Sequence, residues 1–350
     1  MQLVSMLTPD IHRSYKDRSV LVTGGLGFIG SNLVIALAQA GAQVKVVDSS
    51  VAGCGANPFN LDPVCGGVEI YAFDIGDAEV ERPLREADII FNLAGEVSHI
   101  HSMLFPERDL RINTLAQLRF LEACRRVAPG RRIVYASTRQ VYGAPQYLPV
   151  DEEHPIAPVD YNGVHECATA RYHHLLTRLG CIDAVVLRFT NVYGPRMAIQ
   201  LPCQGVLSVF LRKAIFGEPI TLYGDGSQVR DPIHVSDACE ALLRAGSVKS
   251  PKSRTLNVGG RAPVTLLRIA DELRAQRCLP ATEFLPFPAE RARIDIGSYC
   301  SDSSACEAAL GWHAITDLCR GLRETLRYYD EHVTRYLETG RAYSCPLSHS

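Results

Sequence analysis

The stretch Val20-Leu-Val-Thr-Gly-Gly-Leu-Gly-Phe-Ile-Gly30 decides the fold of this 350-residue chain. It begins as an apolar strand and ends in a glycine-rich turn. Gly24, Gly27 and Gly30 let the backbone approach a pyrophosphate and let the next helix pack tightly, and the first N–H groups of that helix supply partial positive charge. The stretch therefore predicts a dinucleotide-binding turn.

The residues that follow complete a strand–helix–strand unit. A helical pattern over Ser31–Ala40 ends before Gly41, and a second apolar strand, Gln43–Val47, leads into Asp48. A carboxylate at the end of the second strand can accept hydrogen bonds from both ribose hydroxyls of the adenosine half, and it repels a 2′-phosphate. The unit therefore predicts NAD rather than NADP as the cofactor.

The composition excludes several kinds of partner and site. Lys and Arg number 36 against 38 Asp and Glu, the formal net charge is −2, and no long run of one sign occurs. We therefore expect no nucleic acid and no membrane surface as a partner. The apolar stretches are too short to cross a bilayer and residues 1–16 lack a targeting pattern, which indicates a cytoplasmic protein. The twelve cysteines form no Cys-x-x-Cys pair or ligand cluster, so neither a disulfide framework nor a metal site is indicated.

Apolar segments and helical patterns alternate along the first half of the chain. Further strands are predicted at Glu69–Phe73, Ile89–Leu93, Arg132–Ala136 and Ala184–Phe189, with helices at Asp109–Arg126 and His165–Leu179. This alternation predicts an α/β fold with a Rossmann-type, doubly wound parallel sheet. After Tyr193 the pattern changes to short elements with Pro and Gly, which predicts a smaller mixed α/β substrate lobe. The predicted segments are an NAD-binding domain at 17–192 with a later segment near 228–240 returning to it, a substrate lobe at 193–335, and tails at 1–16 and 340–350.

Two short motifs follow later strands of the predicted sheet. Asp74-Ile75 comes after the third strand, where an acidic residue and an aliphatic neighbour can hold an adenine ring. Asn92-Leu93-Ala94-Gly95 ends the fourth strand with small residues. Ligands of such sheets lie at the carboxyl ends of the strands, so we expect the dinucleotide to contact Asp74, Ile75, Leu93, Ala94 and Gly95.

From Ser19 to about Tyr329 the chain resembles the extended short-chain dehydrogenase/reductase family, in particular its nucleotide-sugar epimerases and dehydratases. The resemblance rests on Thr23-Gly24-Gly25-x-Gly27-Phe28-Ile29-Gly30, Asp74-Ile75, Asn92-Leu93-Ala94, Asn113, Ser137-Thr138-x-x-Val141-Tyr142-Gly143, Arg188-x-x-Asn191-Val192-Tyr193-Gly194-Pro195-Arg196, Gly224-Asp225-Gly226 with Arg230-Asp231, and Leu310-Gly311-Trp312. It implies a pocket shared by NAD and a nucleotide-diphosphate sugar.

The resemblance also implies roles for single residues. Thr138 would hydrogen-bond the reacting sugar hydroxyl. The loop Glu96–Ser102 places titratable groups near the expected nicotinamide site, and we take Ser98 and His99 as substrate contacts. The remaining implied members of the NAD site are Phe28, Ile29 and Asn113.

The implied diphosphate site is less complete. Asn191 and Arg230 would grip the diphosphate, because Arg offers a planar fork to phosphate oxygens. Where family members place a further Arg, this chain has Ala292 between Arg291 and Arg293. We take Arg293 as the candidate for this third contact.

The catalytic signature of the family, Tyr-x-x-x-Lys, is missing. In that signature the Tyr removes the hydroxyl proton, and the Lys binds the nicotinamide ribose and lowers the pKa of the Tyr. Two registers are possible here, Tyr161 with His165 or Asn162 with Glu166. We favour the second, because the residues after Glu166 match those that commonly follow the Lys without an insertion. The usual mechanism therefore cannot run unchanged.

The favoured register leaves the proton carrier open. Residues 162 and 166 are one helical turn apart and share a face. Glu166 can accept hydrogen bonds from ribose hydroxyls, or take a substrate proton if burial raises its pKa. Asn162 can orient the substrate. Tyr161 and His165 are the alternative proton carriers.

The predicted function is NAD-dependent epimerisation of a nucleotide-diphosphate sugar through a transient ketone. One alternative is a nucleotide-sugar 4,6-dehydratase, although Arg139-Gln140 supplies no carboxylate for the added acid–base step. An alternative of another class is a protein that binds NAD and a nucleotide sugar but has lost redox catalysis. The resemblance also implies a homodimer through helices Asp109–Arg126 and His165–Leu179, paired as a four-helix bundle.

Overall fold

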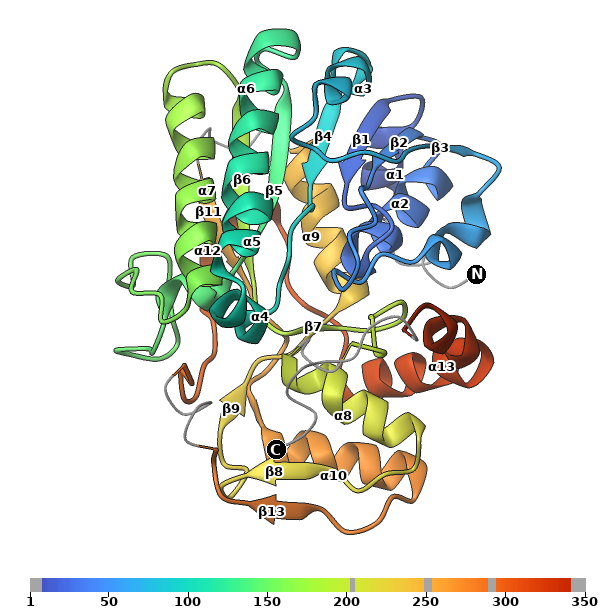
Figure 1. The fold of residues 1–350 in the computed structure, drawn as a ribbon, viewed down its shortest axis with the longest axis vertical. Coiled ribbons are helices and arrows are strands. Elements are labelled where there is room, and N and C mark those ends of the chain that lie inside the picture. The colour runs from blue at the N-terminus through green and yellow to red at the C-terminus, as the bar shows by residue number, and fades with distance from the viewer. Residues whose placement is uncertain (1–7, 202–204, 249–253, 289–293, 341–350) are drawn as a thin grey trace.

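A seven-stranded parallel sheet forms the centre of the protein (Figure 1), in the strand order β11-β6-β5-β4-β1-β2-β3. The computed structural model describes residues 8–201, 205–248, 254–288 and 294–340. This architecture confirms the predicted Rossmann-type sheet. Its strands are β1 (Ser19–Thr23), β2 (Gln43–Val47), β3 (Val68–Tyr71), β4 (Ile89–Asn92), β5 (Arg132–Thr138), β6 (Asp183–Phe189) and β11 (Arg254–Val258).

The glycine turn joins β1 to helix α2 (Phe28–Gln39) as predicted. Gly24 has a φ of +67°, and a Cβ there would lie 2.8 Å from the carbonyl oxygen of Leu93. A Cβ on Gly30 would lie 2.1 Å from the carbonyl oxygen of Gly24. The helix begins at Phe28, earlier than predicted, because the extended Gly27 already serves as its N-cap. The glycines therefore let α2 start directly at the end of β1.

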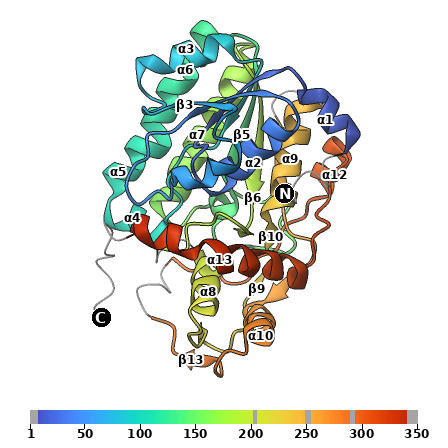
Figure 2. The ribbon, with the colours of Figure 1, turned by 90° about the vertical axis from the view of Figure 1, so that its right-hand side faces the viewer.

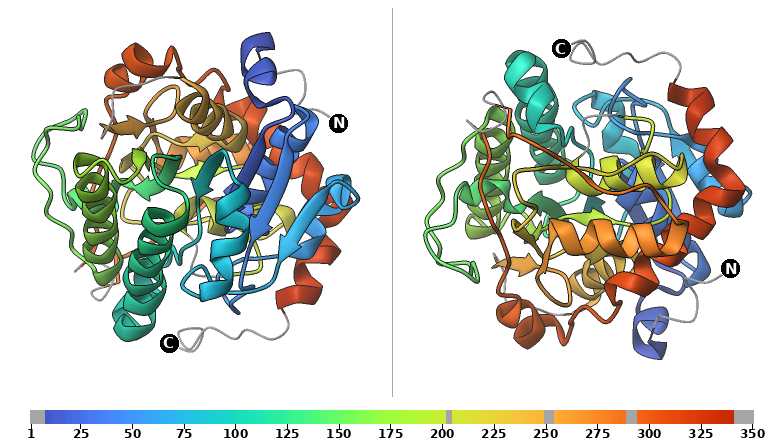
Figure 3. Two further views of the ribbon diagram at one scale, coloured as in Figure 1. Left: turned by 90° about the horizontal axis from the view of Figure 1, so that it is seen from above. Right: turned by 90° about the horizontal axis from the view of Figure 1, so that it is seen from below.

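Helices cover both faces of the sheet (Figure 3). Helices α2, α9 (Val235–Ser247) and α1 (Pro9–Tyr15) pack on one face, and α3 (Glu81–Glu86), α6 (Gln117–Val127) and α7 (Tyr161–Arg178) pack on the other. Successive residues of β1 alternate between the two cores, since Val20 and Val22 join the first and Leu21 joins the second. A parallel sheet covered on both faces explains why its central strands β1 and β4 are mostly apolar and buried.

Residues 9–15, expected to lie in a tail, form helix α1. Ile11 and Tyr15 are buried, and the Tyr15 hydroxyl donates a hydrogen bond to the carbonyl oxygen of Leu243 on α9 at 2.5 Å. Two apolar anchors thus tie this segment to the sheet domain. The remaining predicted tail residues, 1–7 and 341–350, lie outside the described residues.

Two further elements differ from the sequence prediction. The predicted helix Asp109–Arg126 is divided into α5 (Pro106–Leu110), a π-helical segment η4 (Arg111–Ala116) and α6. Strand β11 was not predicted, and it extends the sheet by pairing with β6 in parallel. Its position depends on a partner strand far away in sequence, which local periodicity does not report.

The smaller lobe lies beyond the carboxyl ends of the strands. Its core is formed by α8 (Gly205–Ile215), α10 (Leu266–Arg277) and α13 (Leu318–Gly340), and α13 runs across the molecule between this lobe and the sheet (Figure 2). Tyr336 of α13 donates a hydrogen bond to Asn60 Oδ1 at 2.6 Å. The short elements of the smaller lobe and of the connecting loops are η2 (Pro58–Val64), η3 (Ala78–Val80), α4 (His99–Leu104), η5 (Arg139–Tyr142), β7 (Val192–Tyr193), β8 (Thr221–Tyr223), β9 (Val229–Arg230), β10 (Ile233–His234), β12 (Val264–Thr265), β13 (Glu283–Leu285) and α12 (Ser304–Leu310).

The described residues contain no helix that is long and apolar enough to span a membrane. Within the same residues, no cluster of three or more His, Cys, Asp or Glu side chains is placed to hold a metal ion. The ten described cysteines are all free thiols.

Replacing Gly30 with Ala is expected to lower the free energy of unfolding by about 3 kcal/mol, because the added methyl group would meet the backbone oxygen of Gly24 at 2.1 Å. Urea denaturation measures the change. Gly66→Ala is the matched control, since a Cβ there has no neighbour within 4 Å. Equal stability of the two variants would show that the turn accepts a side chain at residue 30.

Candidate active site

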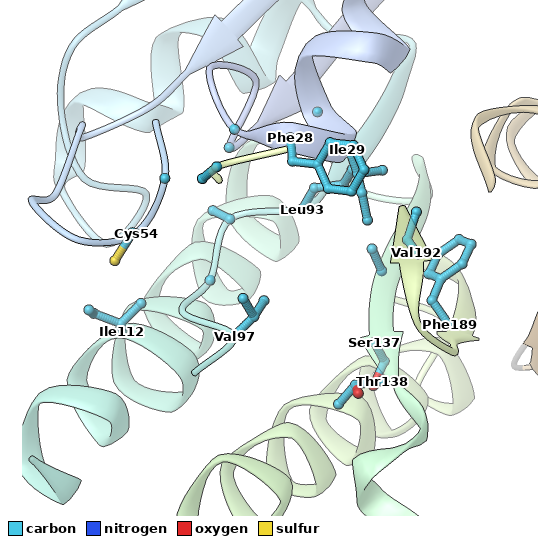
Figure 4. A pocket seen from close by; sticks show the side chains of 18 of the residues that line it. Phe28, Ile29, Cys54, Leu93, Val97, Ile112, Ser137, Thr138, Phe189 and Val192 are labelled. Carbon is cyan, nitrogen blue, oxygen red and sulfur yellow. The ribbon is translucent and has the colours of Figure 1, made fainter. Parts of the chain in front are cut away.

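A pocket opens at the carboxyl ends of the parallel strands, where doubly wound sheets bind ligands. The ends of β1, β2, β4, β5 and β6 contribute to its wall, together with one face of α7 and Leu207 of the smaller lobe. Figure 4 shows Phe28 and Leu93 on one side of this space and Ser137 and Thr138 on the other. The pocket therefore joins the glycine turn to the segment with the expected sugar-binding Thr.

The glycine turn forms one end of the pocket. No side chain caps the first N–H groups of α2, which leaves them for an anion such as a phosphate. A Cβ at Gly24 would fill the space against Leu93. The predicted dinucleotide contacts in the pocket wall are Gly24, Gly27, Phe28, Ile29, Asp48, Asp74, Ile75, Leu93, Ala94, Gly95 and Glu166.

Asp48 is fixed at the end of β2 by two backbone hydrogen bonds. Its Oδ2 accepts from Leu26 N at 3.0 Å and its Oδ1 accepts from Ser50 N at 2.8 Å. Burial raises the pKa of this carboxyl, and the two hydrogen bonds oppose that shift. An acidic side chain held here, with the glycine cradle beside it, fits a dinucleotide with a free ribose hydroxyl pair, which is NAD.

A buried hydrogen-bond network fixes the backbone at the end of β4. Thr23 Oγ1 donates to Asn92 Oδ1 at 2.9 Å and accepts from the N–H groups of Leu93 and Ala94 at 3.1 Å each. Asn92 Nδ2 donates to Gln117 Oε1 at 2.7 Å, and Gln117 Nε2 donates to Ala94 O at 2.6 Å. The small residues that line the pocket here are therefore held rigidly.

The position of helix α7 distinguishes between the two possible registers of the catalytic motif. Asp160 caps the helix by accepting a hydrogen bond from Gly163 N at 2.7 Å, so the helix begins at Tyr161 rather than at the predicted residue 165. Asn162 and Glu166 lie on the face that lines the pocket. Tyr161 is 45% exposed and is not part of the pocket wall. The geometry thus favours the register of Asn162 with Glu166.

His165, the other alternative proton carrier, packs against α5. Its Nδ1 donates a hydrogen bond to Asp109 Oδ1 at 2.5 Å, and its ring stacks on Tyr161 with centroids 6.3 Å apart. Neither ring lines the pocket. Two of the five predicted catalytic residues, Tyr161 and His165, therefore do not line the pocket. His165 binds Asp109 on α5, and Tyr161 stacks on His165.

Glu166 is buried in a cluster of hydroxyl groups. Tyr135 Oη donates to Glu166 Oε2 at 2.7 Å, and Ser137 Oγ donates to the same oxygen at 3.0 Å. Burial raises the pKa of Glu166 to about 7, the two hydroxyls lower it, and the charge of Asp109 adds to the rise. Glu166 can therefore exist as a carboxylate or as an acid near neutral pH.

The amide of Asn162 holds the loop after β4. Its Nδ2 donates to Glu96 O at 2.8 Å and to Asp109 Oδ2 at 3.2 Å. Asn113, predicted to contact the cofactor, instead binds both backbone groups of Glu96 at 2.8 Å and does not line the pocket. Asn113 lies in the π-helical segment η4, and such segments are frequent at functional sites.

The predicted substrate contacts Ser98 and His99 take different positions. Ser98 Oγ accepts a hydrogen bond from His101 N at 3.2 Å and caps α4, and Ser98 does not line the pocket. His99 does line it, and His99 Nδ1 lies 3.2 Å from Asp160 Oδ2. The loop therefore contributes one imidazole to the pocket.

The expected sugar and diphosphate contacts are only partly assembled. Thr138 and Asn191 line the pocket. Arg230 does not, and its Nη1 donates to the carbonyl oxygens of Val229 at 2.8 Å and Gly297 at 2.6 Å. Its Nε is buried and has no hydrogen-bond partner among the described residues. Arg293 lies outside the described residues.

Arg139 is a pocket residue that the sequence reasoning did not assign. Its guanidinium lies 4.9 Å from the ring centroid of Tyr299, and its Nη2 donates to Asn191 Oδ1 at 3.4 Å. Its Nη1 is buried without a partner among the described residues. A buried cation with an unpaired donor is costly, so an acceptor on a ligand would stabilise it. The sequence feature that could have indicated Arg139 is its positive charge directly after Thr138.

Comparisons with known proteins agree with this geometry. The sequence model of the "NAD dependent epimerase/dehydratase family" matches residues 20–259. A UDP-glucose 4-epimerase of Mycolicibacterium smegmatis is 29% identical, over 88% of this chain and 97% of its own length. A UDP-glucuronic acid decarboxylase of Danio rerio is 31% identical, over 91% and 75% of the respective chains.

A solved structure shows the same fold with ligands bound. MoeE5, in complex with UDP-glucuronic acid and NAD, is 29% identical and superimposes with a TM-score of 0.78 over 89% of this chain and 99% of its own. The family match extends across the glycine turn, the strand ends and Arg230. The chain belongs to the NAD-dependent epimerase/dehydratase family.

Proposed function

We propose that the protein epimerises a nucleotide-diphosphate sugar with NAD as its cofactor, through a transient keto sugar. The supporting observation is one continuous pocket. It joins the glycine turn and Asp48 to Thr138, Glu166 and Asn191. The relatives named above act on or bind UDP-sugars, and UDP is therefore the first nucleotide to test.

Different residues around the pocket are suited to different parts of this reaction. Bound NAD supplies a hydride acceptor and donor, and the chain must move the proton of the sugar hydroxyl. Thr138 is suited to orient that hydroxyl, because its Oγ1 accepts from Gln140 N at 3.2 Å and keeps its own proton to donate. Asp48 and the first N–H groups of α2 would hold the adenosine ribose and the pyrophosphate.

Glu166 stands where the family has a ribose-binding Lys. As a carboxylate it can accept hydrogen bonds from the ribose hydroxyls, whereas a Lys donates them. Tyr135 and Ser137 occupy one of its oxygens, which leaves the other for a ligand. The reversal of charge thus preserves ribose binding and removes the cation that would activate a Tyr.

Two alternative functions can be compared with the geometry. For a dehydratase, the positions after Thr138 carry no carboxylate, and Gln140 Nε2 is committed to Asp160 Oδ2 at 3.1 Å. One observation favours the second alternative, a protein that only binds NAD and a nucleotide sugar. Asn162 cannot act as a base, and its amide nitrogen is already occupied.

Incubation with NAD and either UDP-glucose, UDP-glucuronic acid or UDP-N-acetylglucosamine is expected to produce the epimer of at least one of them, detected by proton NMR. Thr138→Ala should lower kcat about 100-fold, because it removes one positioned hydrogen bond to the reacting oxygen. Thr138→Ser is the matched control and should retain most activity. Binding of NAD and of a UDP-sugar without any epimer or reduced NAD would support the binding-protein alternative instead.

The Glu166→Gln variant tests the buried carboxyl. The folded protein holds a proton on Glu166 up to about pH 7, whereas the unfolded chain releases it near the ordinary pKa of 4.5. Raising the pH through this window therefore favours unfolding. Between about pH 5 and about pH 8 the wild type should lose about 3 kcal/mol more unfolding free energy than Glu166→Gln. Urea denaturation at both pH values measures this difference, and parallel curves would contradict a raised pKa.

Exposed apolar side chains on α4, α5, η4 and α7 support a homodimer. Val164 and Leu175 are three helical turns apart on one face of α7, and Leu115 lies on the neighbouring η4. The exposed fractions of these side chains lie between 41 and 49%: Leu104, Phe105, Leu110, Leu115, Val164 and Leu175. We propose that a second copy of the chain covers this face.

The double variant Leu115→Glu with Leu175→Glu is expected to be monomeric in light scattering, because two buried carboxylates without partners would oppose association. Ile315→Glu is the control, since Ile315 is 46% exposed but lies outside this face. The wild type should be a dimer. A monomeric wild type would refute the proposed interface.

A further inference from the structure

We propose that His99 and Asp160 form the acid–base pair that replaces the missing Tyr, with His99 Nε2 taking the proton of the sugar hydroxyl and later returning it. This inference rests on the proposed function and names the group that carries its proton. Asp160 acts through His99 and is a positioning residue.

Few side chains of the pocket wall are suited by chemical type and position to carry the proton of the sugar hydroxyl. Asp48 and Asp74 lie at the adenosine end. Burial raises the pKa of Cys54 to about 11. Glu166 and His99 remain among the described residues that line the pocket. Glu166 occupies the ribose-binding position and shares one oxygen with two hydroxyl donors, so His99 is the better placed proton carrier.

Asp160 places a buried negative charge beside the imidazole of His99. Its side chain is fully buried, with 0% exposure, and Oδ2 lies 3.2 Å from His99 Nδ1. Oδ1 accepts from Gly163 N at 2.7 Å and Oδ2 accepts from Gln140 Nε2 at 3.1 Å. Burial alone would raise the pKa of Asp160, but the contacts with His99, Gly163 and Gln140 lower it, so it is a carboxylate at neutral pH.

His99 Nδ1 is buried and is not aligned for a hydrogen bond, since it has no hydrogen-bond partner among the described residues. The negative charge of Asp160 Oδ2 at 3.2 Å still favours the tautomer that has its proton on Nδ1. The lone pair then lies on Nε2, which is the arrangement by which a buried Asp orients a catalytic His. His99 has 34% of its side chain exposed. Its free edge is therefore open to a ligand, while the Asp160 side is closed.

Gln140 links this pair to the expected sugar site. Its backbone N–H donates to Thr138 Oγ1 at 3.2 Å, and its side-chain Nε2 donates to Asp160 Oδ2 at 3.1 Å. One residue thus fixes the position of the hydroxyl that orients the substrate and of the carboxylate that orients the imidazole. Because Gln140 contacts both groups, it keeps the hydroxyl of Thr138 and the carboxylate beside His99 at fixed positions relative to each other.

The proposed step balances. The sugar hydroxyl loses its proton to Nε2 of His99, and the carbon that bears this hydroxyl loses a hydride to NAD. These two losses leave a C=O double bond on the sugar and an imidazolium on His99. The negative charge of Asp160, with Oδ2 3.2 Å from Nδ1, stabilises the imidazolium. Return of the hydride to the opposite face of the ketone, with return of the proton from Nε2, gives the epimer.

The first test is the tautomer of His99 in the protein without ligands, read by proton–nitrogen NMR of the imidazole nitrogens. The His99 signal is the one that disappears in His99→Gln. We expect a proton on Nδ1 and an unprotonated Nε2 in the wild type, and a shift toward the Nε2–H tautomer in Asp160→Asn. Asn can keep the N-cap to Gly163 N, but its amide nitrogen cannot accept from Gln140 Nε2 as Asp160 Oδ2 does. We therefore expect a lower melting temperature, and the tautomer of the folded protein is the readout. An unchanged tautomer in Asp160→Asn would overturn the positioning role.

The second test is kinetic, with the UDP-sugar that the wild type converts. His99→Gln should lower kcat by about 100-fold to 10,000-fold, with the affinities for NAD and UDP unchanged, and added imidazole should partly restore His99→Ala. His165→Gln is the matched control, because His165 also pairs with a buried carboxylate but lies outside the pocket.

The outcomes separate the inference from the proposed function. A wild type that turns over while His99→Gln turns over equally, or while only Glu166→Gln loses kcat, overturns the inference and leaves the proposed function intact. A wild type that binds NAD and UDP-sugars without turnover overturns both.

Discussion

The contact between Gly30 and the carbonyl of Gly24 is the constraint on which the rest of the structure depends. A Cβ at residue 30 would lie 2.1 Å from that oxygen, so only glycine lets α2 start at the tip of β1. The start of α2 then faces the pocket with uncapped N–H groups. Leu26 N, within the same turn, donates to Asp48. The phosphate end and the ribose end of the site are therefore fixed by one tight turn.

Residue 166 on α7 is an acid in this chain, whereas the pattern of the family has a Lys at this position. A buried Lys would need an anionic or strongly polar environment, whereas Glu166 is surrounded by the hydroxyl donors of Tyr135 and Ser137. Burial of an acid costs less when its proton is retained, which is why its pKa rises to about 7. The surroundings of residue 166 thus match a carboxyl group, and its ligand contacts change from donating to accepting.

The pocket wall is also held from behind by carboxylates that do not face the ligand. Asp109 binds both Asn162 and His165, and Asp160 caps α7 while lying beside His99. These buried acids connect α5, α7 and the loop after β4. Each is paired, because an isolated buried charge is costly. The position of the loop that carries His99 is therefore coupled to the start of α7.

The sequence by itself determined the strand–helix–strand unit, Asp48 and the one-turn spacing of Asn162 and Glu166, because these depend on backbone hydrogen bonds and glycine conformations within a few residues. It also indicated the parallel sheet through alternating apolar segments. Only the tertiary structure placed β11 beside β6, turned Tyr161 out of the pocket and brought His99 to Asp160. These contacts join segments far apart in the chain, and packing of whole elements, not local periodicity, decides which side chains meet.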